Sequence, residues 1–130
     1  MNKMILGFLL LAGVSTQAAQ VPVFNCTVPG KPSTVTLEVA VSDNESVDYV
    51  TVTLNDKGAI NLFTQMEKGG AQKQVAAGNL GTLVFGEQIS QGDDGVLRDS
   101  GILSLSQDAG KWNGLLSAKG SVYPLECTKL

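Results

Sequence analysis

Hydrophobic and polar residues alternate along two early segments of the chain, Ser33–Val41 and Val47–Leu54. A period of two places successive side chains on opposite faces of a strand, so each segment should bury one face and solvate the other. The apolar sets are Val35, Leu37, Val39 and Val41 in the first segment, and Val50, Val52 and Leu54 in the second. The residues Asn55-Asp-Lys-Gly58 then favour a tight hairpin turn, in which glycine readily adopts positive φ.

The next segments carry a weaker pattern. Within Ala59–Lys68, the spacing of Ile60, Phe63 and Met66 suits a helix, whereas Ile60, Leu62 and Thr64 suit a strand. We favour the strand, because the preceding turn is typical of a hairpin. Ala71–Gly78 has the best helix propensity in the chain but only one bulky apolar residue, Val75. We expect a single short helical turn or a weak strand there.

Short apolar segments separated by turn residues continue to the end of the chain. Further strands are expected at Val21–Val28, Gly81–Glu87 (around Leu83 and Phe85), Val96–Asp99, Gly101–Ser106 (with Ile102, Leu103 and Leu105), Lys111–Ala118 and Ser121–Leu130. Eight or nine short strands with turns between them are typical of an all-β sandwich or barrel. We therefore predict a mainly antiparallel meander, closed as a small barrel or a flattened sandwich.

The two cysteines, Cys26 and Cys127, lie in the first and last expected strands, 101 positions apart. The chain has no Cys-x-x-Cys motif and no histidine to lower a thiol pKa, so redox-active thiols are the poorer alternative. We predict a disulfide between them. A disulfide requires Cα atoms within about 7 Å, so the terminal strands would be neighbours and the meander would close.

The first 19 residues have the pattern of an export signal. Lys3 precedes the apolar stretch Met4–Val14, which is too short to span a bilayer, and the polar stretch Ser15–Gln20 follows it. We expect cleavage after Ala18 or Ala19, which leaves residues 20–130 as one domain. Val14 occupies the position of a lipidated cysteine, so no lipid anchor is expected. The mature chain should reach the periplasm or the extracellular space, where disulfides form.

Charge narrows the range of partners. The chain carries a net charge of −3, and removal of Lys3 makes it −4. The basic residues are scattered, which argues against nucleic acid, because phosphate binding needs concentrated Lys and Arg. No further stretch is long and apolar enough to cross a membrane. We expect the mature chain to be a monomer.

Candidate chemistry is sparse. The absence of histidine excludes Ser-His-Asp and Cys-His catalysis and histidine-ligated metal sites. Carboxylates gather at Asp43, Glu45 and Asp48 and again at Asp93 and Asp94. Both sets fall in expected turns, where solvation keeps a carboxylate acidic, although paired carboxylates could also act as acid and base. We predict no enzyme activity, no cofactor and no metal, and we regard these five residues as candidate binding residues.

Trp112 is the remaining candidate for a binding role. It follows a turn at the start of an expected strand, so it either packs in the core or lines a ligand entrance at the barrel mouth. The sequence thus suggests a small exported non-enzymatic β-domain that binds a ligand or another protein through its loops. The candidate loops are Ser42–Ser46, Glu67–Gly78 and Ser90–Gly95.

Two narrower hypotheses accompany this one. The chain is similar in its general plan to small periplasmic lysozyme inhibitors. The shared features are an export signal, a β-meander, cysteines near both ends and an excess of acidic residues. That resemblance implies a basic hydrolase as the partner, although the inhibitory Ser and Lys motifs of the family find no residue-by-residue match. The alternative is a lipocalin-like carrier with a small apolar ligand inside the barrel.

Overall fold

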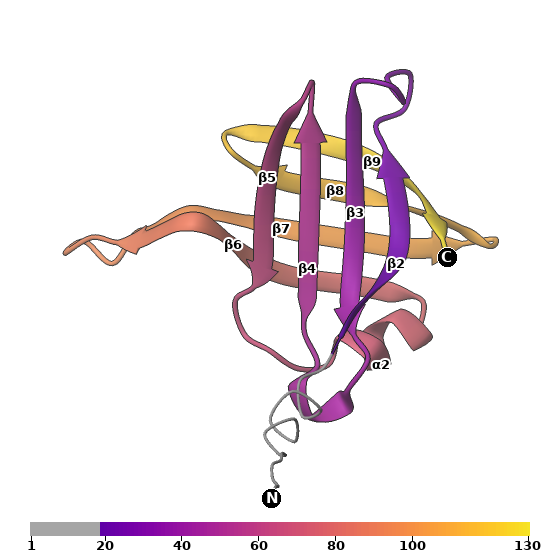
Figure 1. Cartoon of the computed structure of the whole chain (residues 1–130), viewed down its shortest axis with the longest axis horizontal. Coiled ribbons are helices and arrows are strands. Elements are labelled where there is room, and N and C mark those ends of the chain that lie inside the picture. The colour runs from indigo at the N-terminus through magenta and orange to yellow at the C-terminus, as the bar shows by residue number, and fades with distance from the viewer. Residues whose placement is uncertain (1–18) are drawn as a thin grey trace, which may run out of the picture.

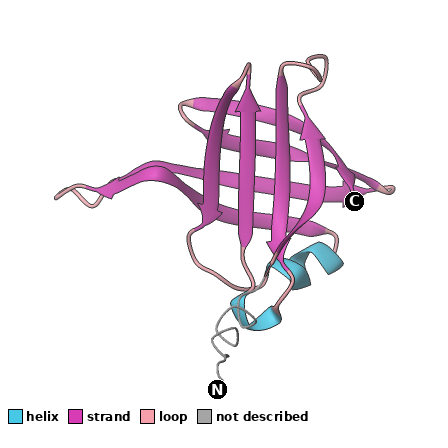
Figure 2. Cartoon of the chain, viewed as in Figure 1, coloured by secondary structure: helices cyan, strands magenta, loops and turns pink. Residues whose placement is uncertain are grey.

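The computed structural model describes residues 19–130, and in this part of the chain eight antiparallel strands close into a barrel (Figures 1 and 2). The strands are β2 (Gln20–Thr27), β3 (Val35–Ser42), β4 (Val50–Asp56), β5 (Ala59–Gln65), β6 (Asn79–Gln91), β7 (Leu97–Asp108), β8 (Lys111–Ala118) and β9 (Ser121–Lys129). Each strand pairs with the next in the chain, and β9 pairs with β2. The predicted closed meander is confirmed. The export signal predicted at 1–19 lies, apart from Ala19, outside the described residues.

The barrel is flattened into two layers whose strands cross. In Figure 1, β2 to β5 run along one layer, and β6 to β9 run across them in the other. The chain passes between the layers at the β5–β6 corner, where pairing is limited to Phe63–Gln65 and Val84–Gly86. The two layers meet again where β9 pairs with β2. Such crossed packing lets side chains from both layers meet in one core.

The core confirms the alternation predicted for β3 and β4, because all seven apolar residues of the two sets are buried. In β5 the predicted strand is confirmed, but Ile60 and Leu62 face outward, whereas Phe63 and Gln65 face inward. The two-residue turn at Lys57 and Gly58 sets Phe63 opposite the buried Val52, and this register decides the face.

Strand β6 shows the same inversion. It buries Leu80 and Val84. Of the two residues around which the strand was predicted, Leu83 is 54% exposed and Phe85 is half-buried. The strands predicted separately at 96–99 and 101–106 are one continuous strand, β7, so the barrel has eight strands rather than nine.

Two short helical elements lie beside one end of the barrel (Figure 2). The 3-10 helix η1 (Glu45–Val47) follows β3, and α2 (Ala71–Ala76) follows β5. The short helical turn expected at 71–78 is therefore present as α2. Gly70 and Gly78 flank it with φ angles of 77° and 91°, which glycine adopts without a steric cost. Val75 packs against the hydrophobic core.

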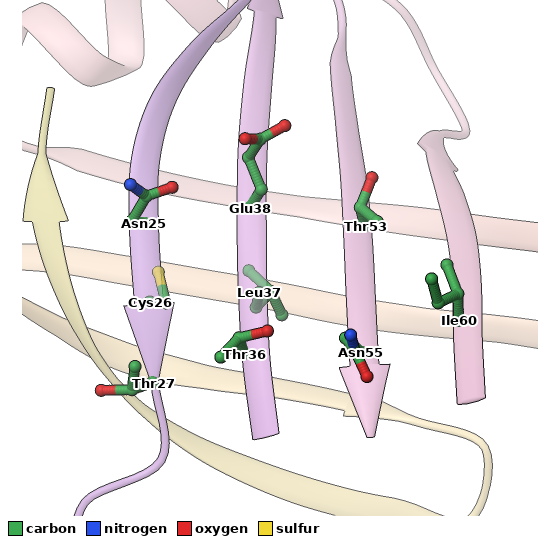
Figure 3. Close-up of a pocket in the computed structure, with 9 residues that line it drawn as sticks. All are labelled: Asn25, Cys26, Thr27, Thr36, Leu37, Glu38, Thr53, Asn55 and Ile60. Carbon is green, nitrogen blue, oxygen red and sulfur yellow. The ribbon is translucent and has the colours of Figure 1, made fainter. Parts of the chain in front are cut away.

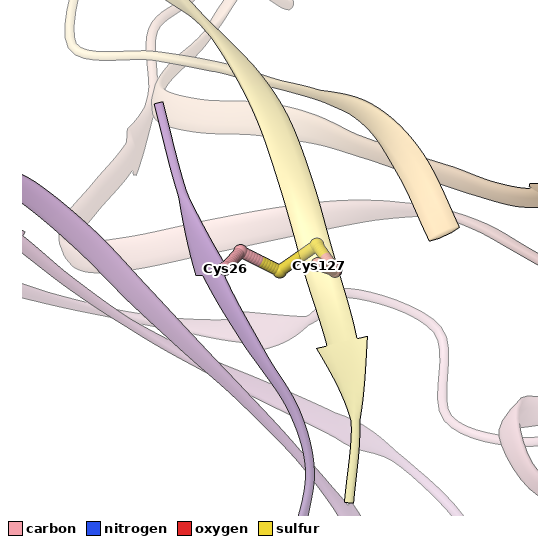
Figure 4. The surroundings of a disulfide bond; sticks show 2 residues. All are labelled: Cys26 and Cys127. Carbon is pink, nitrogen blue, oxygen red and sulfur yellow. A yellow bond between two sulfur atoms is a disulfide. The ribbon is translucent and has the colours of Figure 1, made fainter. Parts of the chain in front are cut away.

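The predicted disulfide is confirmed and joins β2 to β9 (Figure 4). Cys26 and Cys127 are direct partners in the register of this strand pair, with Cα atoms 4.0 Å apart. The bond thus closes the barrel at its seam, and it is consistent with an oxidising compartment. None of the helices in residues 19–130 has the length and apolar character needed to traverse a bilayer.

Candidate functional site

The long β6–β7 hairpin projects beyond the barrel. These strands have 13 and 12 residues, and in Figure 1 their ends continue as an orange ribbon past the edge of β5. Within the described chain, β5 pairs with β6 no further than Gly86, and β8 pairs with β7 only from Ile102 onward. We call the exposed segment Glu87–Arg98 the arm. Both its edges lack a neighbouring strand among residues 19–130.

Side-chain hydrogen bonds fix the tip of the arm. Asp94 accepts a hydrogen bond from the Val96 backbone N–H at 2.9 Å and pairs with Arg98 at 3.3 Å. The Gln91 side chain donates to the Gly95 carbonyl at 3.0 Å. The Val96 hydrogen bond, followed by that from Arg98, lowers the pKa of Asp94. An isolated hairpin is only marginally stable in water, so these bonds help to hold the arm in one shape.

Asp99 anchors the base of the arm. Its carboxylate accepts the Gln88 backbone N–H at 2.6 Å and pairs with Lys119 of the β8–β9 turn at 3.0 Å. The hydrogen bond from Lys119 is the main reason that the pKa of Asp99 is lowered. Gly86 leaves room for this carboxylate, because a Cβ at that position would overlap it. The β6–β7 register shifts here, between Phe85 and Ser90, so the arm leaves the barrel at an irregularity of the strand pair.

The arm carries exposed apolar side chains that the barrel does not use. Ile89, Val96 and Leu97 are 36%, 48% and 38% exposed. A groove of about 340 Å³ lies at the base of the arm. Its lining includes the apolar residues Met66, Leu83, Leu97 and Ile102. Apolar side chains on a fixed projection, next to a groove with apolar and polar lining residues, are suited to burial against a partner.

The predicted acidic residues lie on different elements. Asp93 and Asp94 are both at the arm tip. Asp43 instead accepts the Ala19 backbone N–H at 3.1 Å and holds the start of β2. Asp48 is 8% exposed, and both its oxygens accept the Gln72 N–H at the start of α2. Glu45 is exposed in η1. The structure thus gives Asp43 and Asp48 structural contacts, and a binding role for these residues stays a prediction.

Trp112 lies inside the barrel. It is 3% exposed, and its ring centroid is 4.6 Å from that of Phe24, at an interplanar angle of 57°. Its indole Nε1 has no hydrogen-bond partner among the described residues. The sequence analysis allowed two positions for Trp112, in the core or at a ligand entrance, and the structure places it in the core. Contact between Trp112 and a ligand stays a prediction.

The outer face of β2 to β5 forms a broad hollow of about 370 Å³ (Figure 3). Asn25, Glu38 and Thr53 are neighbours across three strands and form one row of polar side chains. Thr27, Thr36 and Asn55 form a second row, whereas Leu37 is buried in the core. Threonine favours strands and is readily solvated, so a polar sheet face accounts for this hollow.

The sequence did not single out Ile89, Leu97 or Arg98, and these residues complete the arm. The one local signal was the pair Asp94 and Arg98, four positions apart around Gly95, which favours a closed turn. In the part of the chain that the structure describes, no three His, Cys, Asp or Glu residues come together to hold a metal ion. Compared with protein-family models, curated proteins and solved structures, the chain matches none of them.

Proposed function

We propose that this protein is an exported, non-enzymatic β-barrel that binds another protein through the arm. The observation that carries the proposal is a projecting hairpin that exposes apolar side chains, contributes no residue to the buried core and is nevertheless fixed at its tip and base. A surface held in its binding conformation before contact loses less conformational entropy on association. The partner would meet this surface in the periplasm or outside the cell.

The charge of the chain favours a basic partner. The arm carries Glu87, Asp93 and Asp94 against one cation, Arg98, and Asp94 already pairs with that cation. Residues 20–130 carry a net charge of −4. Complementary potentials raise association rates and discriminate against wrong partners. Nucleic acid, which is itself anionic, is disfavoured for the same reason.

A basic hydrolase such as lysozyme is the narrower candidate. A two-stranded projection can enter an active-site cleft that the flat face of a barrel cannot, and the shape of the arm favours this inhibitor function. The carrier hypothesis finds less support, because large side chains such as Phe24, Phe63 and Leu54 occupy the interior. We expect a monomer that needs no cofactor.

The test measures binding of the oxidised chain to immobilised basic secreted proteins, with c-type lysozyme and ribonuclease A as probes. The arm variant carries Ile89→Ser, Val96→Ser and Leu97→Ser. The matched control carries Ile60→Ser, Leu62→Ser and Val122→Ser, which are outward-facing apolar positions on β5 and β9. We expect the wild type and the control to bind at least one probe, and the arm variant to bind about tenfold more weakly or less.

Two further measurements are the dependence of binding on ionic strength and the inhibition of lysozyme turnover. Binding should weaken between low and physiological ionic strength, because exposed charges are screened. Inhibition of lysozyme turnover by the wild type, but not by the arm variant, would favour the inhibitor candidate. Equal binding by the arm variant and the wild type would overturn the assignment to the arm. Failure of the wild type to bind either probe would overturn the basic-partner proposal as tested.

A further inference from the structure

An apolar hollow of about 280 Å³ lies where α2 meets the barrel. Its apolar walls come from three elements: Val23 of β2, Val41 of β3, and Val75 with Ala76 of α2. Among the five hollows described along residues 19–130, this one has the most apolar lining. It is separate from the arm, because none of its lining residues belongs to β6 or β7.

Local structure places these walls. The β2–β3 register shifts between Pro22 and Phe24, so Val23 lies at a bulge. A bulge re-aims a side chain that regular pairing would hold in line with the strand. Val23 is consequently half-buried beside the core rather than fully exposed. The hollow therefore depends on an irregularity of the sheet and not on a flat strand face.

The opposite wall, α2, is fixed to the barrel. The Gln72 backbone N–H donates to Asp48, and the Gln72 side chain donates to the Ser42 carbonyl at 2.6 Å. At the other end of the helix, the Gly81 N–H donates to the Gln74 side chain at 2.8 Å. The hollow thus exists before any ligand enters it, as is usual for small-molecule sites.

One of the lining residues has a charged side chain. Lys129 lines the hollow and forms no ion pair within residues 19–130. The carboxylate of Asp48, behind α2, is engaged by the Gln72 N–H through both oxygens. A shallow apolar hollow with a lysine at its edge matches a molecule with an aliphatic chain and a carboxylate head. The volume lies just below the roughly 300 Å³ at which typical ligand pockets begin, so the chain must be short.

We infer that this hollow binds a small aliphatic carboxylate. The alkyl chain lies against Val23, Val41 and Val75, and the carboxylate pairs with the Lys129 ammonium. This binding site goes beyond the proposed protein-binding function and does not depend on it.

The experiment titrates the oxidised chain with octanoate and with octanamide, which has the same shape but no charge. Binding is measured by calorimetry, and its location by amide chemical-shift changes. We expect shifts centred on Val23, Val75 and Lys129, and octanoate binding about two- to fivefold tighter than octanamide, because an exposed ion pair contributes little. Lys129→Gln should bring octanoate down to the affinity of octanamide and leave octanamide unchanged.

Two further variants make the result specific. Ala76→Leu fills the hollow from an exposed helical position that tolerates leucine, so it should weaken both ligands without unfolding the chain. Lys31→Gln removes an exposed lysine of the β2–β3 loop, which does not line the hollow, and should change neither affinity. The inference is overturned if octanoate leaves the amides of this hollow unshifted, or if Lys129→Gln and Lys31→Gln have equal effects.

Discussion

Asp99 connects the arm to the barrel through a single carboxylate. Its side chain is only 10% exposed, and it meets the Lys119 ammonium from one side and the Gln88 N–H from the other. Its φ angle of 63° lies in the left-handed region, which asparagine and aspartate tolerate better than most residues. Asp99→Asn should therefore keep the backbone conformation and the Gln88 hydrogen bond while removing the charge. The substitution isolates the ion pair with Lys119.

The lowered pKa of Asp99 predicts a dependence of stability on pH. A carboxyl group whose folded pKa is depressed stabilises the fold fully above its unfolded pKa, about 3.9 for aspartate, and loses this contribution as pH falls through the folded value. Asp99→Asn should thus lower the free energy of unfolding by about 1 kcal/mol or less at pH 7. The difference should vanish below the folded pKa of Asp99. Urea unfolding of both proteins across this pH range measures it.

Asp94→Asn is the matched control, because the pKa of Asp94 is also lowered but its ion pair with Arg98 is exposed at the arm tip. It should change global stability less than Asp99→Asn does. Hydrogen exchange at the Gln88 amide adds a local measurement, since loosening at the base of the arm should speed exchange there. A difference between wild type and Asp99→Asn that stayed constant down to pH 2 would contradict the assignment of the effect to this charge.

Gln65, at the end of β5, connects β4 to the loop that precedes α2. Its side-chain oxygen accepts the buried Val50 N–H at 3.0 Å, and its side-chain nitrogen donates to the Gly69 carbonyl at 3.1 Å. Gln65→Met keeps the volume but removes both bonds, so the Val50 N–H is left without its acceptor. We expect a loss of about 1–3 kcal/mol in the free energy of unfolding. Chemical denaturation at neutral pH measures the loss.

Gln65→Glu separates the two hydrogen bonds of Gln65. A glutamate retains the acceptor for Val50 but cannot donate to Gly69 when ionised, and it places a charge in a buried position. It should be destabilising at neutral pH and recover part of the stability in acid, where the carboxyl group is protonated. A Gln65→Met protein as stable as the wild type would contradict the contribution assigned to these two hydrogen bonds.

At the scale of elements, alternation identified β3 and β4 together with their buried faces. The buried face of β5 could also have been predicted from the sequence, because a two-residue turn at Lys57 and Gly58 places Phe63 opposite Val52. The tip of the arm was among the candidate loops, as Ser90–Gly95, but the projection itself could not be predicted in this way. Its residues are exposed on all sides, so no burial pattern marks it, and its direction depends on Asp99 contacting Lys119 from another hairpin. Contacts between distant segments leave no local signal in a single sequence.

The same limit applies to the α2 hollow. The sequence indicated a short helical turn or a weak strand at 71–78, but it did not indicate which part of the barrel this segment packs against. The hollow arises from a bulge at Val23 and from hydrogen bonds that Gln72 makes to Asp48 and Ser42, 24 and 30 positions away. Asp48 illustrates the consequence, because the sequence placed this carboxylate among the candidate binding residues but did not indicate that it contacts the start of a helix.

At the scale of the whole molecule, the seam between β2 and β9 closes the barrel. Backbone pairing there covers only Phe24–Thr27 against Glu126–Lys129, and the disulfide lies in the middle of it. Removing the bond frees the two ends of the chain in the unfolded state, across a separation of 101 residues. The replacement Cys26→Ala with Cys127→Ala should lower the free energy of unfolding by roughly 2–5 kcal/mol. Denaturation of the double variant and of the oxidised wild type measures the difference.

The double variant also tests whether the seam and the arm are independent. The arm is fixed by Asp99 and Lys119 at the turn of the β8–β9 hairpin, whereas the seam lies at the other end of β9. A folded double variant should therefore keep the partner affinity of the wild type. Reduced wild-type protein is the control for the alanine side chains and should show the same loss of stability. If the variant remained folded but lost binding together with the disulfide, the barrel seam itself would have to shape the binding surface. Peptide mapping under non-reducing conditions, showing Cys26 linked to Cys127 in one chain, establishes the oxidised reference for both measurements.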